Sequence, residues 1–199
     1  MNKPRSSRLY TDNIISSISQ NINYKKLLFI GLMGAGKTTI GKLIANYINY
    51  AFYDLDKEIE KKHNKSIKEI FSTEGEIQFR KTEAIIIKKL LLSSSKNNGM
   101  VIASGGGAFL NKETRILAKD NALTIWLKAD LDLLYKRTQN KSNRPLLNLE
   151  NKKETLERLI KLRYPIYKEA NITVECIKTS KLNMAKKVLN HIEVFVNET

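Results

Sequence analysis

The stretch LLFIGLMGAGKTTIGKLIANYI, residues 27–48, decides the fold of this chain. Its first four residues are apolar and predict a buried strand, and the apolar spacing over 38–48 predicts a helix. Between them, Gly31, Gly34 and Gly36 let the backbone turn and come close to a ligand. A helix that begins at such a turn presents unpaired N–H groups and its positive dipole end. The stretch therefore predicts an anion-binding turn between a strand and a helix.

The spacing around the glycines identifies the anion. Residues 31–38 match G-x-x-x-x-G-K-[ST], the P-loop, in the strand–turn–helix context that this motif requires. In that motif Lys37 supplies charge to the outer phosphates and Thr38 offers a hydroxyl to Mg²⁺. The residues expected to surround the phosphates are Gly34, Ala35, Gly36, Lys37, Thr38 and Thr39. An ordinary glycine-rich turn explains a full match poorly, so we expect a nucleoside triphosphate.

Length and composition limit the class of protein. The 199 residues, 42% of them apolar, suit a polar extension over 1–25 and one domain over 26–199. A single cysteine excludes a disulfide framework. The net charge of +15 is spread along the chain, without the interleaved aromatic residues of a nucleic-acid platform. No run approaches the roughly 18 apolar residues of a membrane span. We expect a cytoplasmic monomer that binds neither nucleic acid nor membranes.

Apolar runs alternate with helical patterns, which predicts an α/β fold with a parallel sheet covered on both faces. The expected strands cover 26–30, 51–53, 99–104, 122–127 and 171–176. The expected helices cover 38–48, 56–64, 66–73, 77–92, 129–137, 153–170 and 182–195, with an interruption near Pro165 and with Ser66 and Asp130 as caps. The polar, basic segment 137–154 is long for a loop in a compact domain, and we expect it to be a lid.

Acidic residues and glycines follow the second and third strands, where ligands gather in an open α/β sheet. Asp54 and Asp56 suit a magnesium contact and a proton acceptor, although such a pair before a helix is equally often an N-cap. Arg80 and Glu83 are spaced to pair on one helix. Three consecutive glycines, 105–107, indicate either close approach to a ligand or a loose turn.

Three arginines complete the candidate site. Arg80 and Arg163 could bind a carboxylate in the bidentate way that lysine cannot, although each arginine alone is more often a solvated charge. Arg144 lies where a closing lid would bring charge to the transferring phosphate. The guanine signature N-K-x-D is absent, and the chain is small for an oligomeric motor. A small-molecule kinase is the natural interpretation.

Together these motifs resemble the shikimate kinases, ATP-dependent enzymes of aromatic amino-acid biosynthesis. The matching segments are, in order, GLMGAGKTTIGKLIA, FYDLDKEIE, IKEIFSTEGEIQFRKTE, VIASGGGAF, NRPLL and RYPIYKEA, within residues 27–192. The resemblance implies the three-layer α/β/α fold of the nucleoside monophosphate kinases, with a five-stranded parallel sheet in the order 2-3-1-4-5 and a lid. It also implies transfer of the γ-phosphoryl group of ATP, with Mg²⁺, to the 3-hydroxyl of shikimate.

The resemblance further implies residue roles. Asp54 would position Mg²⁺ with Thr38, and Asp56 would be the base near the accepting hydroxyl. The implied catalytic residues are Lys37, Asp56 and Arg144, of which Arg144 would also contact ATP. The implied shikimate contacts are Asp56, Arg80, Gly105, Gly106, Gly107 and Arg163. The segment expected at the adenine, 178–183, lacks the arginine or proline of some members and leaves Thr179 and Lys181 as candidates.

Three alternatives remain open. A kinase for another small polyol or acid, such as gluconate, fits less well because of Arg80 and Arg163 on separate expected helices and because of the triple-glycine turn. A relative that binds or regulates without catalysis is disfavoured by the complete implied catalytic set. A nucleic-acid-binding P-loop protein would reveal itself by salt-dependent retention on nucleic acid.

Overall fold

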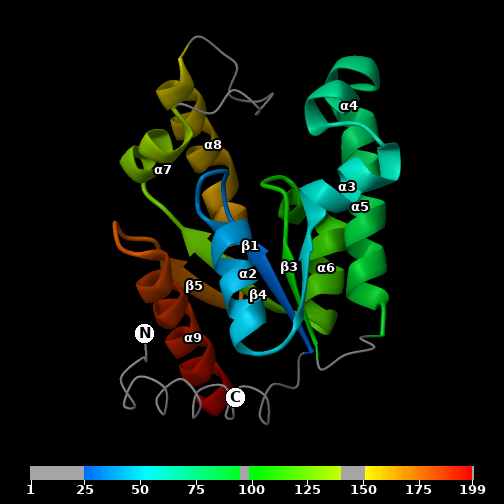
Figure 1. Ribbon diagram of the computed structural model, residues 1–199. Helices are drawn as coiled ribbons and strands as arrows, with labels where there is room; N and C mark the ends of the chain where they lie inside the picture. The colour runs from blue at the N-terminus through cyan, green and yellow to red at the C-terminus, as the bar shows by residue number, and fades with distance from the viewer. Residues whose placement is uncertain (1–24, 95–98, 140–150, 199) are drawn as a thin grey trace, which may run out of the picture.

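The computed structural model describes residues 25–94, 99–139 and 151–198 of the chain. Its centre is a five-stranded parallel sheet in the order β2-β3-β1-β4-β5, with helices on both faces (Figure 1). The strands are β1 (Lys26–Ile30), β2 (Ala51–Asp54), β3 (Met100–Ala103), β4 (Leu123–Lys128) and β5 (Ile172–Glu175). The helices are α2 (Lys37–Tyr47), α3 (Leu55–His63), α4 (Ile67–Thr73), α5 (Gly75–Leu92), α6 (Lys112–Asn121), α7 (Leu131–Thr138), α8 (Lys152–Tyr167) and α9 (Lys181–Glu198), with the short 3₁₀ helix η1 (Ala108–Leu110). The predicted fold class and strand order are confirmed.

The central strand β1 explains why the sheet forms where it does. Its residues 27–30 are apolar and fully buried, because β3 and β4 flank it and helices cover both faces. Phe29 lies level with Ala103 of β3, and Ile30 lies level with Trp126 of β4. The carboxyl ends of these strands therefore open at one edge, where parallel α/β sheets bind ligands.

The local signals for helix starts are confirmed. Ser66 and Glu69 form the predicted capping box before α4, with each side chain accepting from the other residue's backbone N–H. Asp130 caps α7 by accepting a hydrogen bond from the N–H of Leu133. The other boundaries differ from expectation by no more than a few residues, as helix ends commonly do.

Two features differ from the sequence prediction. Helix α6 was not predicted, and only Thr114 and Ala118 of its residues are buried, so its apolar pattern is weak. Helix α8 is not interrupted at Pro165 but continues to Tyr167. Pro165 lies in the last turn, where its missing N–H removes only one helical hydrogen bond. Just beyond it, the N–H of Lys168 still donates to the carbonyl of Tyr164, so the helical hydrogen-bond pattern continues to the end of α8.

The expected lid is described only at its ends. Residues 137–138 close α7, and α8 begins at Lys152, so both ends of the 137–154 segment are helical. Residues 140–150, with Arg144, and the extension over 1–24 lie outside the described residues. Among the residues that are described, no helix is long and apolar enough to cross a membrane.

Candidate phosphate and acceptor site

The P-loop turn has the geometry for which its glycines are needed. Gly31 and Gly36 have φ values of 137° and 106°, in the region that favours glycine. A Cβ on Gly31 would lie 2.6 Å from the carbonyl oxygen of Leu127, and one on Gly34 would lie 2.8 Å from the Thr138 methyl. The turn is therefore packed tightly against the end of β4 and against α7, which fixes its backbone N–H groups.

Lys37 lies over this turn and is nearly buried, with 8% of its surface exposed. Its Nζ donates hydrogen bonds to the carbonyl oxygens of Gly31 at 2.8 Å and Leu32 at 3.0 Å. These two carbonyls of the turn hold the ammonium group beside the turn. A phosphate oxygen bound at the turn would accept hydrogen bonds from the Lys37 ammonium and from backbone N–H groups that are already oriented.

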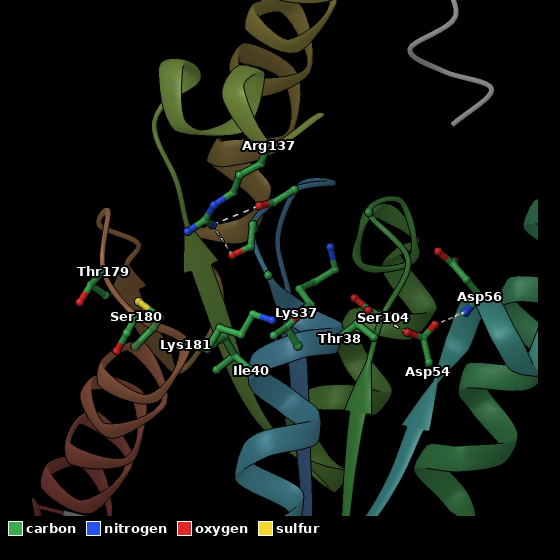
Figure 2. Close-up of a pocket in the computed structure, with 16 residues that line it drawn as sticks. Lys37, Thr38, Ile40, Asp54, Asp56, Ser104, Arg137, Thr179, Ser180 and Lys181 are labelled. Carbon is green, nitrogen blue, oxygen red and sulfur yellow. Dashed lines mark hydrogen bonds between the residues drawn. The ribbon is translucent and has the colours of Figure 1, made fainter. Parts of the chain in front are cut away.

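Thr38 and Asp54 meet at the amino end of α2 and the end of β2. The Thr38 hydroxyl donates to Asp54 Oδ2 at 2.7 Å, as Figure 2 shows. The other oxygen, Oδ1, accepts from the N–H groups of Asp56 at 3.1 Å and Lys57 at 3.4 Å and so caps α3. The sequence allowed two roles for Asp54, an N-cap or a magnesium contact. Asp54 is an N-cap, and it also presents a carboxylate oxygen to the P-loop.

This pair suits a magnesium ion that also binds phosphates. Mg²⁺ prefers oxygen ligands and is held by one or two protein groups together with water and substrate phosphates. Over the described ranges there is no cluster of three or more His, Cys, Asp or Glu residues that could hold a metal alone. The hydroxyl of Thr38 and the carboxylate of Asp54 are hard oxygen donors beside the phosphate turn, so they fit this ion.

A cavity of about 420 Å³ opens over the turn, and we name it the P-loop cavity. It is lined by residues 34–40 together with Asp54, Asp56, Ser104, Gly106, Arg137, Thr179, Ser180, Lys181 and Met184. Both adenine candidates, Thr179 and Lys181, therefore reach the same cavity as the phosphate turn (Figure 2). Arg137 also lines this cavity, although its sequence context did not predict a site residue. Its Nη1 donates to the carbonyls of Gly34 and Ala35 at 3.2 Å each. This residue was read as part of the lid, and no local signal connects it with a turn about 100 positions earlier.

A second cavity of about 540 Å³, the arginine cavity, lies on the other side of Asp54 and Asp56. Its wall comprises Met33, Thr38, Asp54, Asp56, Lys57, Glu60, Ser66, Ile67, Lys68, Phe71, Phe79, Arg80, Glu83, Gly105, Gly106, Gly107 and Arg163. The two cavities share Thr38, Asp54, Asp56 and Gly106. A group bound in one cavity is therefore next to a group bound in the other, which is the arrangement that transfer between two substrates requires.

Arg80 enters the arginine cavity from α5, held by two carboxylates. Its Nη1 donates to Glu83 Oε2 at 2.8 Å, and its Nε and Nη2 donate to Glu76 Oε1 at 3.2 and 3.0 Å. Glu83 is only 2% exposed, so the predicted pair is not a surface ion pair. Burial raises the pKa of the Glu83 carboxyl, and the charge of Arg80 opposes that rise. Among the described residues, Glu83 Oε1 has no hydrogen-bond partner.

The triple glycine lies where three charged side chains pass close to the backbone. A Cβ on Gly105 would lie 2.3 Å from Glu83 Oε1, and one on Gly107 would lie 2.3 Å from Arg80 Nη1. A Cβ on Gly106 would lie 3.3 Å from Nη1 of Arg163. The alternative of a loose turn is therefore wrong, because side chains at these positions would collide with the charged groups of the cavity.

Arg163 enters the same cavity from α8 and is 7% exposed. Its Nη1 donates to the Gly106 carbonyl at 2.8 Å. Two buried or half-buried guanidinium groups, on separate helices, thus face one cavity beside Asp56. Such groups suit a small anionic ligand with a carboxylate. The structure brings together every predicted site residue except Arg144, which lies outside the described residues.

Known proteins are similar to this chain in sequence and in architecture. The family model described as shikimate kinase matches residues 33–193. A shikimate kinase of Bartonella henselae is 39% identical over 197 residues, which cover 99% of this chain and 92% of that relative. One of Rhizobium meliloti is 44% identical over 170 residues, covering 85% and 86% of the two chains.

A solved structure gives the same result in three dimensions. The shikimate kinase from Acinetobacter baumannii in complex with shikimate has a TM-score of 0.80 and 33% sequence identity to this chain. The match covers 87% of this chain and 95% of that one. With the family match and two relatives aligned over most of their length, the chain belongs to the shikimate kinase family.

Proposed function

We propose that this chain transfers the γ-phosphoryl group of ATP to the 3-hydroxyl of shikimate, giving shikimate 3-phosphate and ADP. The observation that carries the proposal is the meeting of the two cavities at Asp54 and Asp56. One cavity contains a phosphate-binding turn, and the other contains two arginines suited to a carboxylate. Family membership supports the same reaction, since shikimate kinases use ATP with Mg²⁺.

On the donor side, the N–H groups of residues 34–39 bind the phosphates of ATP. Lys37 exchanges its hydrogen bonds to the Gly31 and Leu32 carbonyls for oxygens of the transferred group. Thr38 and Asp54 hold Mg²⁺, which neutralises charge between the phosphates. Thr179 and Lys181 lie where the same cavity can take the adenine. Arg144, from the segment outside the described residues, is proposed to reach the phosphates as well.

On the acceptor side, Arg80 and Arg163 bind the carboxylate of shikimate. The glycines 105–107 let the ring lie close to the backbone, and no described residue accepts a hydrogen bond from their N–H groups. Those N–H groups are therefore available to the substrate's oxygens. Asp56 lines both cavities and accepts the proton of the attacking hydroxyl. Catalysis on this scheme is positioning and charge stabilisation rather than covalent chemistry.

The test is a coupled assay of ADP release with shikimate, gluconate and other small hydroxy acids. We expect shikimate to stimulate ADP release far above ATP alone. Asp56→Asn should abolish turnover but still bind ATP, whereas Asp120→Asn, an exposed aspartate on α6, should behave as wild type. Stimulation by another acid and none by shikimate would refute the substrate assignment. Equal loss of turnover and ATP binding in Asp56→Asn would assign that residue to the nucleotide instead.

We also propose that the enzyme acts as a cytoplasmic monomer without nucleic acid. The net charge of +15 is spread along the chain, without the interleaved aromatic residues of a nucleic-acid platform. Light scattering at assay concentrations should give the mass of one chain, 22.8 kDa. A stable larger species, or salt-dependent retention on nucleic acid at physiological ionic strength, would contradict this part of the proposal.

A further inference from the structure

The carbonyl of Gly106 accepts two hydrogen bonds from one helix. Arg163 Nη1 donates to it at 2.8 Å, and the hydroxyl of Tyr167, one turn further along α8, donates to the same oxygen. Tyr167 is 1% exposed, so its hydroxyl has no access to bulk water. Two donors on one carbonyl fix the orientation of that peptide group more firmly than a single donor does.

That peptide group also carries the N–H of Gly107. Because a trans peptide is planar, its C=O and N–H point in opposite directions, and fixing one of them fixes the other. The Gly106 carbonyl points to α8, so the Gly107 N–H points away from α8. Gly107 lines the arginine cavity, and no described residue accepts a hydrogen bond from its N–H. The donors on α8 therefore set the direction of the Gly107 N–H group, which lies at the arginine cavity.

Arg163 must share its N–H donors between this carbonyl and a substrate carboxylate. A guanidinium that turns to form a bidentate pair through both of its Nη groups takes them away from other acceptors. The part-buried Gly106 carbonyl would then lose one donor, and a carbonyl shielded from water without a partner is costly. The hydroxyl of Tyr167 donates to the backbone and its ring packs against Trp126. The same hydroxyl also lies within hydrogen-bond reach of Arg163, so it can stay on the carbonyl while Arg163 turns.

We infer that Tyr167 is a positioning residue for the acceptor: it holds the Gly106–Gly107 peptide in place while Arg163 binds the substrate's carboxylate. This inference rests on the proposed function, because it requires a carboxylate acceptor in the arginine cavity. Burial raises the pKa of Tyr167 to about 12, so the hydroxyl stays protonated and remains a donor throughout the physiological pH range. The residue acts through the backbone and does not touch the reacting atoms.

The chain offers a matched control three residues away on the same helix. Tyr164 is half-buried, and its hydroxyl donates to the carbonyl of Ala129, which lines neither cavity. Both tyrosine rings pack against Trp126, with centroids 4.9 Å away for Tyr164 and 5.9 Å for Tyr167. A phenylalanine at either position keeps the ring and removes one hydrogen bond to a backbone carbonyl. The two variants therefore differ in which carbonyl loses its donor, and Tyr167→Phe also removes the contact between the hydroxyl and Arg163.

The test compares Tyr167→Phe with Tyr164→Phe by steady-state kinetics and by thermal unfolding with and without shikimate. Tyr167→Phe should raise the KM for shikimate about tenfold, as expected for one lost hydrogen bond at a buried group. Its KM for ATP should stay within about twofold of wild type, and shikimate should raise its Tm less than it raises that of wild type. Tyr164→Phe should lower the Tm but leave both KM values unchanged.

The outcomes separate the two claims. If wild type phosphorylates shikimate and Tyr167→Phe has the wild-type KM, or if both variants raise the shikimate KM equally, Tyr167 is merely structural and the inference is wrong. A parallel rise of both KM values in Tyr167→Phe would refute it too. A wild-type enzyme that does not phosphorylate shikimate would overturn the proposed function, and this inference with it. If Tyr167→Phe is too unstable for kinetics, thermal scans begun at low temperature decide instead. A shikimate-induced rise in Tm equal to that of wild type would refute the inference, and a smaller rise would support it.

Discussion

Replacing Gly107 with alanine should move Arg80 without straining the backbone. Gly107 has φ −108° and ψ −16°, which alanine can adopt. The new Cβ would lie 2.3 Å from Arg80 Nη1 and 2.6 Å from Cζ. Ordinary contact begins near 3.4 Å, so the guanidinium must shift by about 1 Å. Its ion pairs with Glu76 and Glu83 hold it on the other side, and the shift must distort them.

The size of the effect follows from that displacement. A misplacement of about 1 Å in a group that positions a substrate can cost roughly 100-fold in rate. A hydrogen bond to a charged group contributes about 1.5–3 kcal/mol, which corresponds to about 10- to 100-fold in affinity. We therefore expect the KM for shikimate to rise about 10- to 100-fold in Gly107→Ala. The KM for ATP should stay within about twofold, because the P-loop cavity does not include Gly107.

A double-mutant cycle with Arg80→Ala identifies the cause. If Gly107→Ala acts through Arg80, the double variant should have the same KM for shikimate as Arg80→Ala alone, because the clash is already gone. The coupled ADP assay measures all four enzymes, and thermal unfolding checks that each is folded. Additive effects in the double variant, or an unchanged KM for shikimate in Gly107→Ala, would refute the steric argument.

Further substitutions and one chemical probe test other parts of the site. Thr38→Val removes the hydroxyl that lies 2.7 Å from Asp54, and the free Mg²⁺ needed for half-maximal rate should rise about tenfold in the coupled assay; an unchanged requirement would exclude Thr38 as a ligand. Burial raises the pKa of Glu83 above its ordinary value of 4.5. Above pH 4.5 the folded protein therefore binds more protons than the unfolded chain. Its free energy of unfolding falls as pH rises through the folded pKa. In urea unfolding from pH 4 to 8, Glu83→Gln should not show this fall in the free energy of unfolding. If the free energies of wild type and Glu83→Gln changed in parallel with pH, the interpretation would be wrong. Burial raises the pKa of the Cys176 thiol to about 11, so a thiol reagent at pH 8 should label it only after denaturation. Arg163→Ala should raise the KM for shikimate about 10- to 100-fold, whereas Arg158→Ala, exposed on the same helix, should not; a change confined to ATP would contradict the carboxylate role.

The parts of the fold that depend on local sequence could be predicted. The strand–turn–helix at 26–47 follows from apolar runs and glycine spacing, and the capping box at Ser66 follows from two residues three apart. Helix α6 was missed because it buries little apolar surface. The interruption expected near Pro165 is wrong because tertiary bonds hold the last turn of α8, among them the one from Tyr164 to Ala129.

The site was predicted where its residues belong to contiguous motifs and missed where contacts are long-range. Arg80 and Glu83 pair within one helix, so their spacing predicted the bond. Arg137 contacts Gly34, 103 positions away, and no spacing in the sequence indicates it. The two donors of α8 on the Gly106 carbonyl are likewise visible only when the helix is packed against the glycine turn.

The packing of Trp126 gives this enzyme a built-in optical signal. It is the only tryptophan of the chain and is 2% exposed, edge-on to the rings of Tyr164 and Tyr167. Indole emission from the unmodified protein therefore originates at one point, beneath the helix that carries Arg163. Any acceptor, inhibitor or fragment that shifts α8 should change that emission without a dye or a label. A ligand confined to the P-loop cavity will change it only by moving the same helix, so the emission reports movement of α8 from either cavity.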